Sequence, residues 1–318
     1  MSIKKSLQSL FQEAYSFTKN DFHLLSYVYT LTLIFGCIYL NYTTGFYRDV
    51  MNVTYNSGNS MWAFPLFYSF MYFAVAIPIL IFQKEYKIIR NKGFFLKSLF
   101  FIVLYGVASG YCGYREWEFA SLFTEEKYFL FRIAAQLKGS FIILIPLILL
   151  KISIDKKVDG FYGIARNTKH IHGYLTLFAL LIPFLIVTSF TPDFLNAYPQ
   201  FRPWLYEDIF GWPVWVSTLL FETIYALDFV ITELVFRGAL VIGMISILGR
   251  KAILPMVAMY VSIHFGKPLG ETLSSIFGGY VLGALAYQTR HIWGGIIVHI
   301  CLALTMEIMG FVHYYLLK

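Results

Sequence analysis

The sequence predicts an all-α polytopic membrane protein, a bundle of about eight transmembrane helices with a range of about seven to nine. Three observations predict this fold class. Of the 318 residues, 58% are hydrophobic and only 14% are charged, whereas soluble domains carry roughly 25% charged residues. Apolar runs long enough to cross a bilayer recur along the chain. Aromatic residues reach 19%, and Tyr and Trp are typical of membrane interfaces.

Nine apolar runs are the candidate spans. The first is too long for the apolar part of a signal peptide and has no small-residue cleavage pattern after it, so we interpret it as a retained span. The sixth run is about 35 residues long and the seventh only about 15, so we expect the seventh to end inside the protein. The runs cover 22–42, 62–82, 94–112, 128–150, 171–190, 214–248, 252–266, 271–288 and 292–316.

Basic residues gather in alternate loops between these runs, and this pattern predicts the orientation. Lys and Arg dominate 83–97 and 151–169 and mark the later turns at Arg250, Lys251 and Arg290, whereas loops 43–60, 113–127 and 191–213 are acidic or balanced. By the positive-inside rule we expect a cytoplasmic N-terminus in a prokaryotic plasma membrane. If all nine runs cross, the C-terminus lies outside. The net charge of +7 is therefore an orientation signal, and no nucleic-acid partner is expected.

The segment 191–213 divides the chain. Four prolines, Pro192, Pro199, Pro203 and Pro213, argue against a continuous helix there. Trp204, Tyr206 and Trp212 in the same segment indicate a position at the membrane interface. We therefore predict an N-terminal part, 1–213, with about five spans and the interfacial loop 191–213, followed by a core at 214–318 that carries the polar residues.

Charged residues inside apolar helices are costly, so each needs an explanation. Glu233 and Arg237 are four apart and share a helix face, where they can neutralise one another. Asp228 and Thr232 share an adjacent face with the same spacing. One explanation is a buried ion pair that only fixes helix packing, and the other is a functional site.

Two histidines on separate segments strengthen the functional interpretation. His264 ends a short apolar run, and His299 shares a helix face with Ala303 and Glu307. A carboxylate and an imidazole can together deprotonate a water, and a second imidazole can stabilise an oxyanion. Each His alone is explained as well by an ordinary interhelical hydrogen bond. Zinc bound by Glu233, His264 and His299 is an alternative, but the His-Glu-x-x-His pattern is lacking, so no cofactor is expected.

These segments resemble the CPBP family, the CAAX protease and bacteriocin-processing enzymes, also called Abi. The family's three motifs are Glu-Glu-x-x-x-Arg, Phe-x-x-x-His and His-x-x-x-Asn. Here they are Thr232-Glu233-Leu-Val-Phe-Arg237, Tyr260-Val-Ser-Ile-His264 and His299-Ile-Cys-Leu-Ala303. The resemblance covers about 214–310 and implies an intramembrane glutamic endopeptidase, formerly described as a metalloprotease. It implies water activation by the first Glu of motif one together with His264, an oxyanion role for His299, and an ordering role for Arg237. In this sequence we assign the water-activating role of the carboxylate to Glu233.

Two departures from the family pattern bear on catalysis. Thr232 stands where the family places its first, catalytic Glu, and Ala303 stands where it places Asn. Three possibilities follow: Glu233 has taken over, Asp228 or Glu307 compensates, or the protein no longer cleaves and serves as a binding or scaffolding module. A transporter is a weaker alternative, because no inverted repeat is visible. The expected partners are the lipid bilayer and a peptide or protein substrate.

Overall fold

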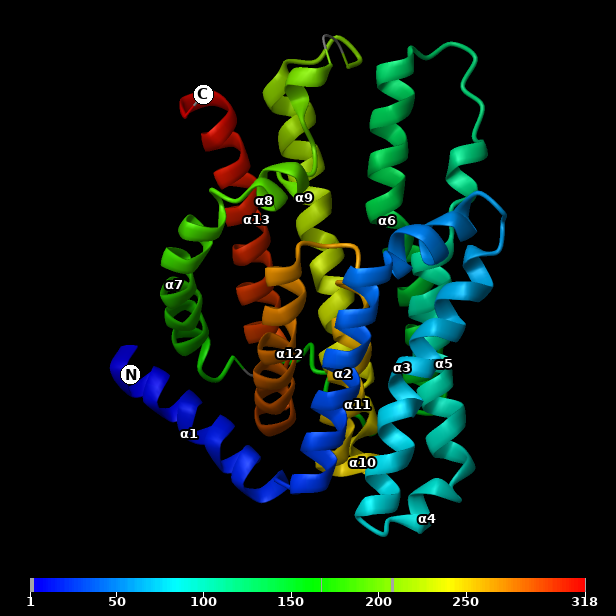
Figure 1. The fold of residues 1–318 in the computed structure, drawn as a ribbon, viewed down its shortest axis with the longest axis vertical. Coiled ribbons are helices and arrows are strands. Elements are labelled where there is room, and N and C mark those ends of the chain that lie inside the picture. The colour runs from blue at the N-terminus through cyan, green and yellow to red at the C-terminus, as the bar shows by residue number, and fades with distance from the viewer. Residues whose placement is uncertain (1–2, 167, 207–208, 318) are drawn as a thin grey trace.

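The computed structural model describes residues 3–166, 168–206 and 209–317, and within them the fold is helical throughout (Figure 1). The β pairing there is confined to one isolated bridge between Phe161 and Ile164. Eight segments are long and apolar enough to cross a membrane. The prediction of an all-α polytopic bundle with about eight spans is confirmed.

The helices follow one another with short connections. Their bounds are α1 Ile3–Asp21, α2 Leu24–Thr44, η1 Tyr47–Met51, η2 Asn52–Tyr55, α3 Ser60–Phe82, α4 Tyr86–Ile89, α5 Lys92–Gly110, η3 Gly113–Glu116, α6 Thr124–Ser153, α7 Ile171–Thr188, α8 Pro192–Ala197, η4 Pro203–Leu205, α9 Val214–Glu233, η5 Leu234–Ala239, η6 Ile242–Met244, α10 Ile245–Leu248, η7 Gly249–Ala252, α11 Ile253–Ser262, α12 Leu269–Thr289 and α13 Trp293–Leu316.

The sixth and seventh predicted runs form one candidate span, Val214–Ser262, that doubles back on itself. After α9 the chain makes the π-helical turn η5 and the short turns up to η7, and α11 then runs back alongside the other helices (Figure 1). Gly249 has φ +55°, a left-handed conformation that glycine adopts without strain, at the reversal. All ten residues of α11 are buried. This agrees with the expectation that the seventh run ends within the protein.

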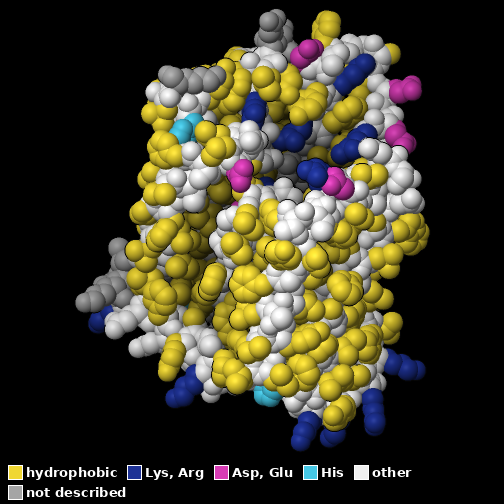
Figure 2. All heavy atoms as spheres, viewed as in Figure 1, with side chains coloured by type: hydrophobic (Ala, Val, Ile, Leu, Met, Phe, Trp, Pro, Cys, Tyr) yellow, Lys and Arg dark blue, Asp and Glu magenta, His cyan; other side chains and the backbone are white. Residues whose placement is uncertain are grey.

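The basic loops lie together at one end of the bundle, here called the basic end. Three ion pairs join them: Lys251 to Glu85 at 3.0 Å, Lys97 to Asp155 at 2.7 Å and Arg290 to Asp159 at 3.8 Å. Lys and Arg side chains project from the lower end of the molecule in Figure 2. Loops far apart in the sequence therefore share one side, as the charge alternation requires.

The remaining loops meet at the other end. The Asn41 side chain donates to the Phe265 carbonyl at 2.9 Å, and the Tyr42 hydroxyl donates to the Lys267 carbonyl at 2.6 Å. The Tyr198 hydroxyl donates to Glu271 at 2.7 Å. The turn between α11 and α12 is thus held beside the C-terminal end of α2 and the segment 191–213. This end is called the opposite end below.

The most buried part of the molecule is the segment that doubles back. One apolar cluster joins side chains of α2, α3, α5, η5, α11 and α12 around it. By contrast, α7 exposes large apolar side chains such as Phe184 and Val187, as expected for a helix that faces lipid. Glu233 and Arg237 therefore lie in the interior of the bundle, surrounded by other helices.

Candidate active site

Glu233 ends α9 and lies at the centre of the polar site. Its side chain is fully buried. Its Oε1 accepts a hydrogen bond from Arg237 Nη1 at 2.8 Å and lies 3.1 Å from His299 Nδ1. The predicted ion pair between Glu233 and Arg237 is therefore present, and it extends to a histidine 66 residues away in the sequence. One oxygen of the buried carboxylate therefore has two nitrogen partners from different parts of the chain.

The second oxygen of this carboxylate is free. Oε2 of Glu233 is buried without a hydrogen-bond partner. It faces Gly295 in the first turn of α13, where an added Cβ would stand 2.2 Å from Oε2. Glycine at 295 is therefore required for the close approach of α13 to the carboxylate. An ionised oxygen left unpaired inside a protein has unused capacity to bind a water or a substrate hydrogen.

Tyr260 of α11 packs against three of the site's side chains. The Arg237 guanidinium carbon lies 4.2 Å from the centre of the Tyr260 ring, a cation–π geometry. The ring centres of His264 and His299 lie 4.8 and 6.3 Å from that of Tyr260. In the sequence Tyr260 is only a mild departure from a motif Phe. In the structure it joins the arginine to both histidines.

His264 lies in the turn after α11, where its backbone and ring are both fixed. The Thr272 hydroxyl donates to the His264 carbonyl at 2.6 Å, and Nδ1 of the ring lies 2.9 Å from the Tyr260 carbonyl oxygen. A carbonyl only accepts, so Nδ1 carries the hydrogen. In the neutral ring Nε2 then holds the lone pair and can act as a base or bind a water.

His299 lies in the second turn of α13 and turns its Nδ1 toward Glu233. The Phe229 ring packs against it at 4.4 Å between centres. Because the carboxylate accepts hydrogens only, Nδ1 of His299 also donates. The two histidines therefore differ in their partners: His299 Nδ1 is bound to the carboxylate, whereas His264 Nδ1 is bound to a backbone carbonyl.

Thr232 and Asp228 lie on another side of α9. Thr232 is buried beside the Tyr105 hydroxyl of α5. Asp228 packs against Gly139 of α6, where an added Cβ would stand 3.3 Å from Oδ1, and its charge interacts with that of Lys138. Neighbouring positions on α9 thus face different helices, since Glu233 faces α13 and Thr232 faces α5.

Ala303 and Glu307 lie farther along α13. Ala303 packs into an apolar cluster with Phe129, Phe221 and Tyr225, so this position supplies no donor. Both Glu307 carboxylate oxygens accept from the backbone N–H of Gln200, at 3.0 and 2.8 Å. Glu307 therefore holds the segment 191–213 against α13.

The geometry does not favour the zinc alternative. Among the described residues, no three His, Cys, Asp or Glu side chains lie close enough together to hold a metal ion. Glu233 and His299 are adjacent, but Oε1 and Nδ1 face one another, and His264 uses Nδ1 on a backbone carbonyl.

The loop before α7 packs against η5 on the side of the basic end. Tyr162 is fully buried, and its carbonyl oxygen would stand 2.6 Å from a Cβ added at Gly238. The Tyr162 hydroxyl donates to Asp155 at 2.8 Å, and Asp155 also pairs with Lys97. The sequence did not predict a role for Tyr162. No motif near residue 162 indicates that this loop packs against the helix turn at Gly238.

Toward the opposite end the surface is hollowed. Figure 2 shows a depression in the upper half of the molecule, with Lys, Arg, Asp and Glu side chains around it. Charged side chains gather there and at the basic end, and apolar side chains cover much of the surface between them in this view.

Comparison with known proteins supports the resemblance carried by the three motifs. Residues 211–305 match the family model described as "Type II CAAX prenyl endopeptidase Rce1-like". This segment begins just before α9 and ends within α13, so it contains Glu233, Arg237, His264 and His299. No curated protein and no solved structure gave a significant match to the chain.

Proposed function

We propose that this protein is an intramembrane endopeptidase that hydrolyses a peptide bond with a water activated by Glu233 and His264. The observation that carries the proposal is the buried Glu233 carboxylate, with Oε1 held by Arg237 and His299 and Oε2 left free. The match of 211–305 to a CAAX endopeptidase family supports the same reaction class.

In this mechanism the free Oε2 of Glu233 and Nε2 of His264 bind the attacking water. As the water oxygen bonds to the peptide carbonyl carbon, its proton passes to Glu233. His299, carrying a hydrogen on both ring nitrogens, donates from Nε2 to the oxyanion of the tetrahedral intermediate while Nδ1 donates to Glu233. The proton on Glu233 then passes to the leaving nitrogen as the C–N bond breaks, which restores the carboxylate. Arg237 is a positioning residue, since it acts through Glu233 and the Tyr260 ring.

The experiment compares new peptide N-termini in membranes that contain the wild-type full chain or a variant. We expect Glu233→Gln and His264→Asn to lower cleavage at least about a hundredfold, the usual contribution of one acid–base group. Glu118→Gln, an exposed change in the loop after η3, is the matched control and should leave cleavage unchanged. Full activity in both site variants, each folded, would reject this assignment.

Asp228 is the second carboxylate to test. It lies one turn before Thr232, and its charge interacts with those of Lys138 and Lys267. If Asp228→Asn abolishes cleavage while Glu233→Gln retains it, the base is Asp228 and Glu233 is structural. The two variants thus distinguish a site in which Asp228 is the catalytic base from one in which Glu233 is the base.

A non-catalytic binding or scaffolding protein is the second candidate. Thr232 and Ala303 favour it, because Thr232 faces α5 beside Tyr105 and Ala303 packs in an apolar cluster. Neither can replace the Glu or Asn of the family motifs. If the wild-type chain cleaves nothing and Thr232→Glu creates cleavage, the site is degenerate and the binding hypothesis holds.

We also propose that the basic end faces the cytoplasm, with the N-terminus on that side. The three ion pairs that join the basic loops support a common side for them. A thiol-reactive, membrane-impermeant reagent should label a cysteine placed at Lys87 only in inverted vesicles. Labelling of a cysteine at Lys87 in intact cells would show the opposite orientation, with the basic end outside.

A further inference from the structure

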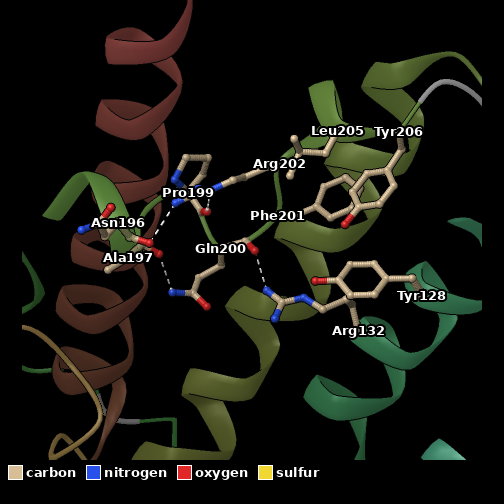
Figure 3. Close-up of a pocket in the computed structure, with 10 residues that line it drawn as sticks. All are labelled: Tyr128, Arg132, Asn196, Ala197, Pro199, Gln200, Phe201, Arg202, Leu205 and Tyr206. Carbon is tan, nitrogen blue, oxygen red and sulfur yellow. Dashed lines mark hydrogen bonds between the residues drawn. The ribbon is translucent and has the colours of Figure 1, made fainter. Parts of the chain in front are cut away.

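A polar cavity lies between α6 and the segment 191–213, and Glu233 is not among its lining residues. It has a volume of about 320 Å³. Figure 3 shows the guanidinium of Arg132 rising from α6 toward the backbone of Gln200, with Arg202 on the other side of the same loop. The rings of Tyr128 and Tyr206, stacked at 5.4 Å, form one wall. None of these residues belongs to the three motifs.

Both arginines are held in place by neutral groups. Arg132 donates to the Gln200 carbonyl, and its guanidinium lies 5.3 Å from the centre of the Phe221 ring. Arg202 donates to the carbonyls of Leu195, Asn196 and Pro199. Carbonyls and rings orient a guanidinium but leave its positive charge in place. The two side chains are therefore fixed before any ligand arrives, which lowers the entropic cost of binding.

None of the residues that line the pocket is Asp or Glu, although the charge of Glu307 interacts with that of Arg132 without an ion-pair contact. Within the described part of the chain, neither Arg132 nor Arg202 forms an ion pair with Asp or Glu. Nε of Arg132 is buried and has no hydrogen-bond partner. A buried donor on a charged group is costly to leave unsatisfied, so an anionic ligand would stabilise this arrangement.

The position of the pocket indicates the kind of anion. It lies at the opposite end, where Trp204 stacks on Tyr314 at 3.6 Å. Trp and Tyr gather where the lipid headgroups begin. Arginine forks match the oxygens of a phosphate and bind it bidentately. We propose that this pocket binds a phosphate-type oxyanion, carried by a lipid headgroup or free in solution.

The same loop connects the pocket to α13. The backbone carbonyl of Gln200 accepts from Arg132, and its backbone N–H donates to Glu307. An anion between the arginines would hold this loop over the helix that carries His299. Anion binding at this pocket does not depend on any step of peptide hydrolysis. The experiment therefore measures binding and not cleavage.

The experiment measures thermal unfolding of the purified full chain in detergent with three additions. These are phosphatidylglycerol, phosphatidylcholine, and inorganic phosphate matched in ionic strength with sodium chloride. We expect phosphatidylglycerol to raise the unfolding temperature in a saturable way. A similar rise with inorganic phosphate assigns the site to a free anion, and a rise with phosphatidylglycerol alone assigns it to a headgroup.

Variants locate the effect in the pocket. Arg132→Gln and Arg202→Gln should weaken the apparent affinity roughly tenfold or more, since each removes a charged donor. Arg115→Gln, which removes an exposed Arg near the same end, is the matched control and should change nothing. Ala197→Phe keeps both arginines and fills the cavity, so it tests the site even if an arginine variant fails to fold.

Two results would overturn the proposal. One is the absence of any saturable rise in the wild-type chain with either phosphate source. The other is an unchanged affinity in folded Ala197→Phe, because a ligand elsewhere on the surface would not sense that side chain.

Discussion

The segment 214–262 and the helices α6 and α7 are built from similar apolar residues but occupy different surroundings. In the most apolar stretch of 214–262, 78% of the residues are buried in the protein, against 17% for α6 and 11% for α7. The first stretch holds a fully buried ion pair, whereas α7 carries no charged residue. Charges at membrane depth therefore depend on partners within the protein, since Lys138 of the largely exposed α6 donates to the carbonyls of Ser109 and Tyr111.

The largest expected effect comes from breaking the buried pair. Arg237→Ala leaves Glu233 buried without its cation and removes the contact with Tyr260, so we expect a loss of about 3–5 kcal/mol in the free energy of unfolding. Thermal or denaturant unfolding in detergent measures this loss. Arg48→Ala is the control, because the pair of Arg48 with Asp49 is largely exposed and should show no measurable change. Equal stability of both variants would contradict the comparison.

The next effect tests the space around the carboxylate. Gly295→Ala would place a methyl group 2.2 Å from Glu233 Oε2, so Glu233 or α13 must move. We expect a loss of about 1–3 kcal/mol, typical of overpacking, together with a loss of peptide cleavage. Gly36→Ala in α2 is the matched control, since a Cβ there meets nothing within 4 Å. That variant should unfold at the same temperature as wild type or slightly above it.

A smaller effect on stability is expected from the loop before α7, which contains Tyr162. Tyr162→Phe keeps the buried ring and removes the hydroxyl that donates to Asp155. We expect a loss of about 1 kcal/mol, the usual value of one hydrogen bond. Thermal unfolding in detergent measures this loss. An unfolding temperature equal to that of the wild type would show that the Tyr162 hydroxyl does not stabilise the loop.

The smallest effect on stability is expected at the edge of the bundle, where α1 packs against the start of α7. Burial raises the pKa of the Glu13 carboxyl, but hydrogen bonds from Lys169 and His170 and their charges bring it below its ordinary value of 4.5. A lowered pKa in the folded state means that this stabilisation is present above pH 4.5 and is lost as the pH falls through the folded pKa.

Glu13→Gln should therefore cost roughly 0–1 kcal/mol at pH 7, as expected for a partly exposed pair. The difference between Glu13→Gln and wild type should shrink as the pH drops below 4.5, which unfolding curves at pH 7 and pH 4 can measure. A difference that grows on acidification would show that Glu13 destabilises α1 docking. His170→Gln is a companion variant, because it removes one of the two partners and keeps Lys169.

The sequence by itself determined the membrane fold and the identity of the polar residues. Apolar length places the spans, and loop charge groups 83–97 with 151–169 and Arg290 at one end, because both signals depend on composition along the chain. The Glu233–Arg237 pair was also predictable, since a spacing of four fixes two side chains on one helix face.

Only the tertiary structure decided which groups meet across helices. The contacts of Glu233 with His299 and Gly295, of Tyr260 with His299 and of Tyr162 with Gly238 all join residues distant in sequence. Helix periodicity fixes the face on which a side chain lies but not the helix that packs against that face. That choice follows from packing the whole bundle, in which Glu233 came to face α13 and Thr232 to face α5.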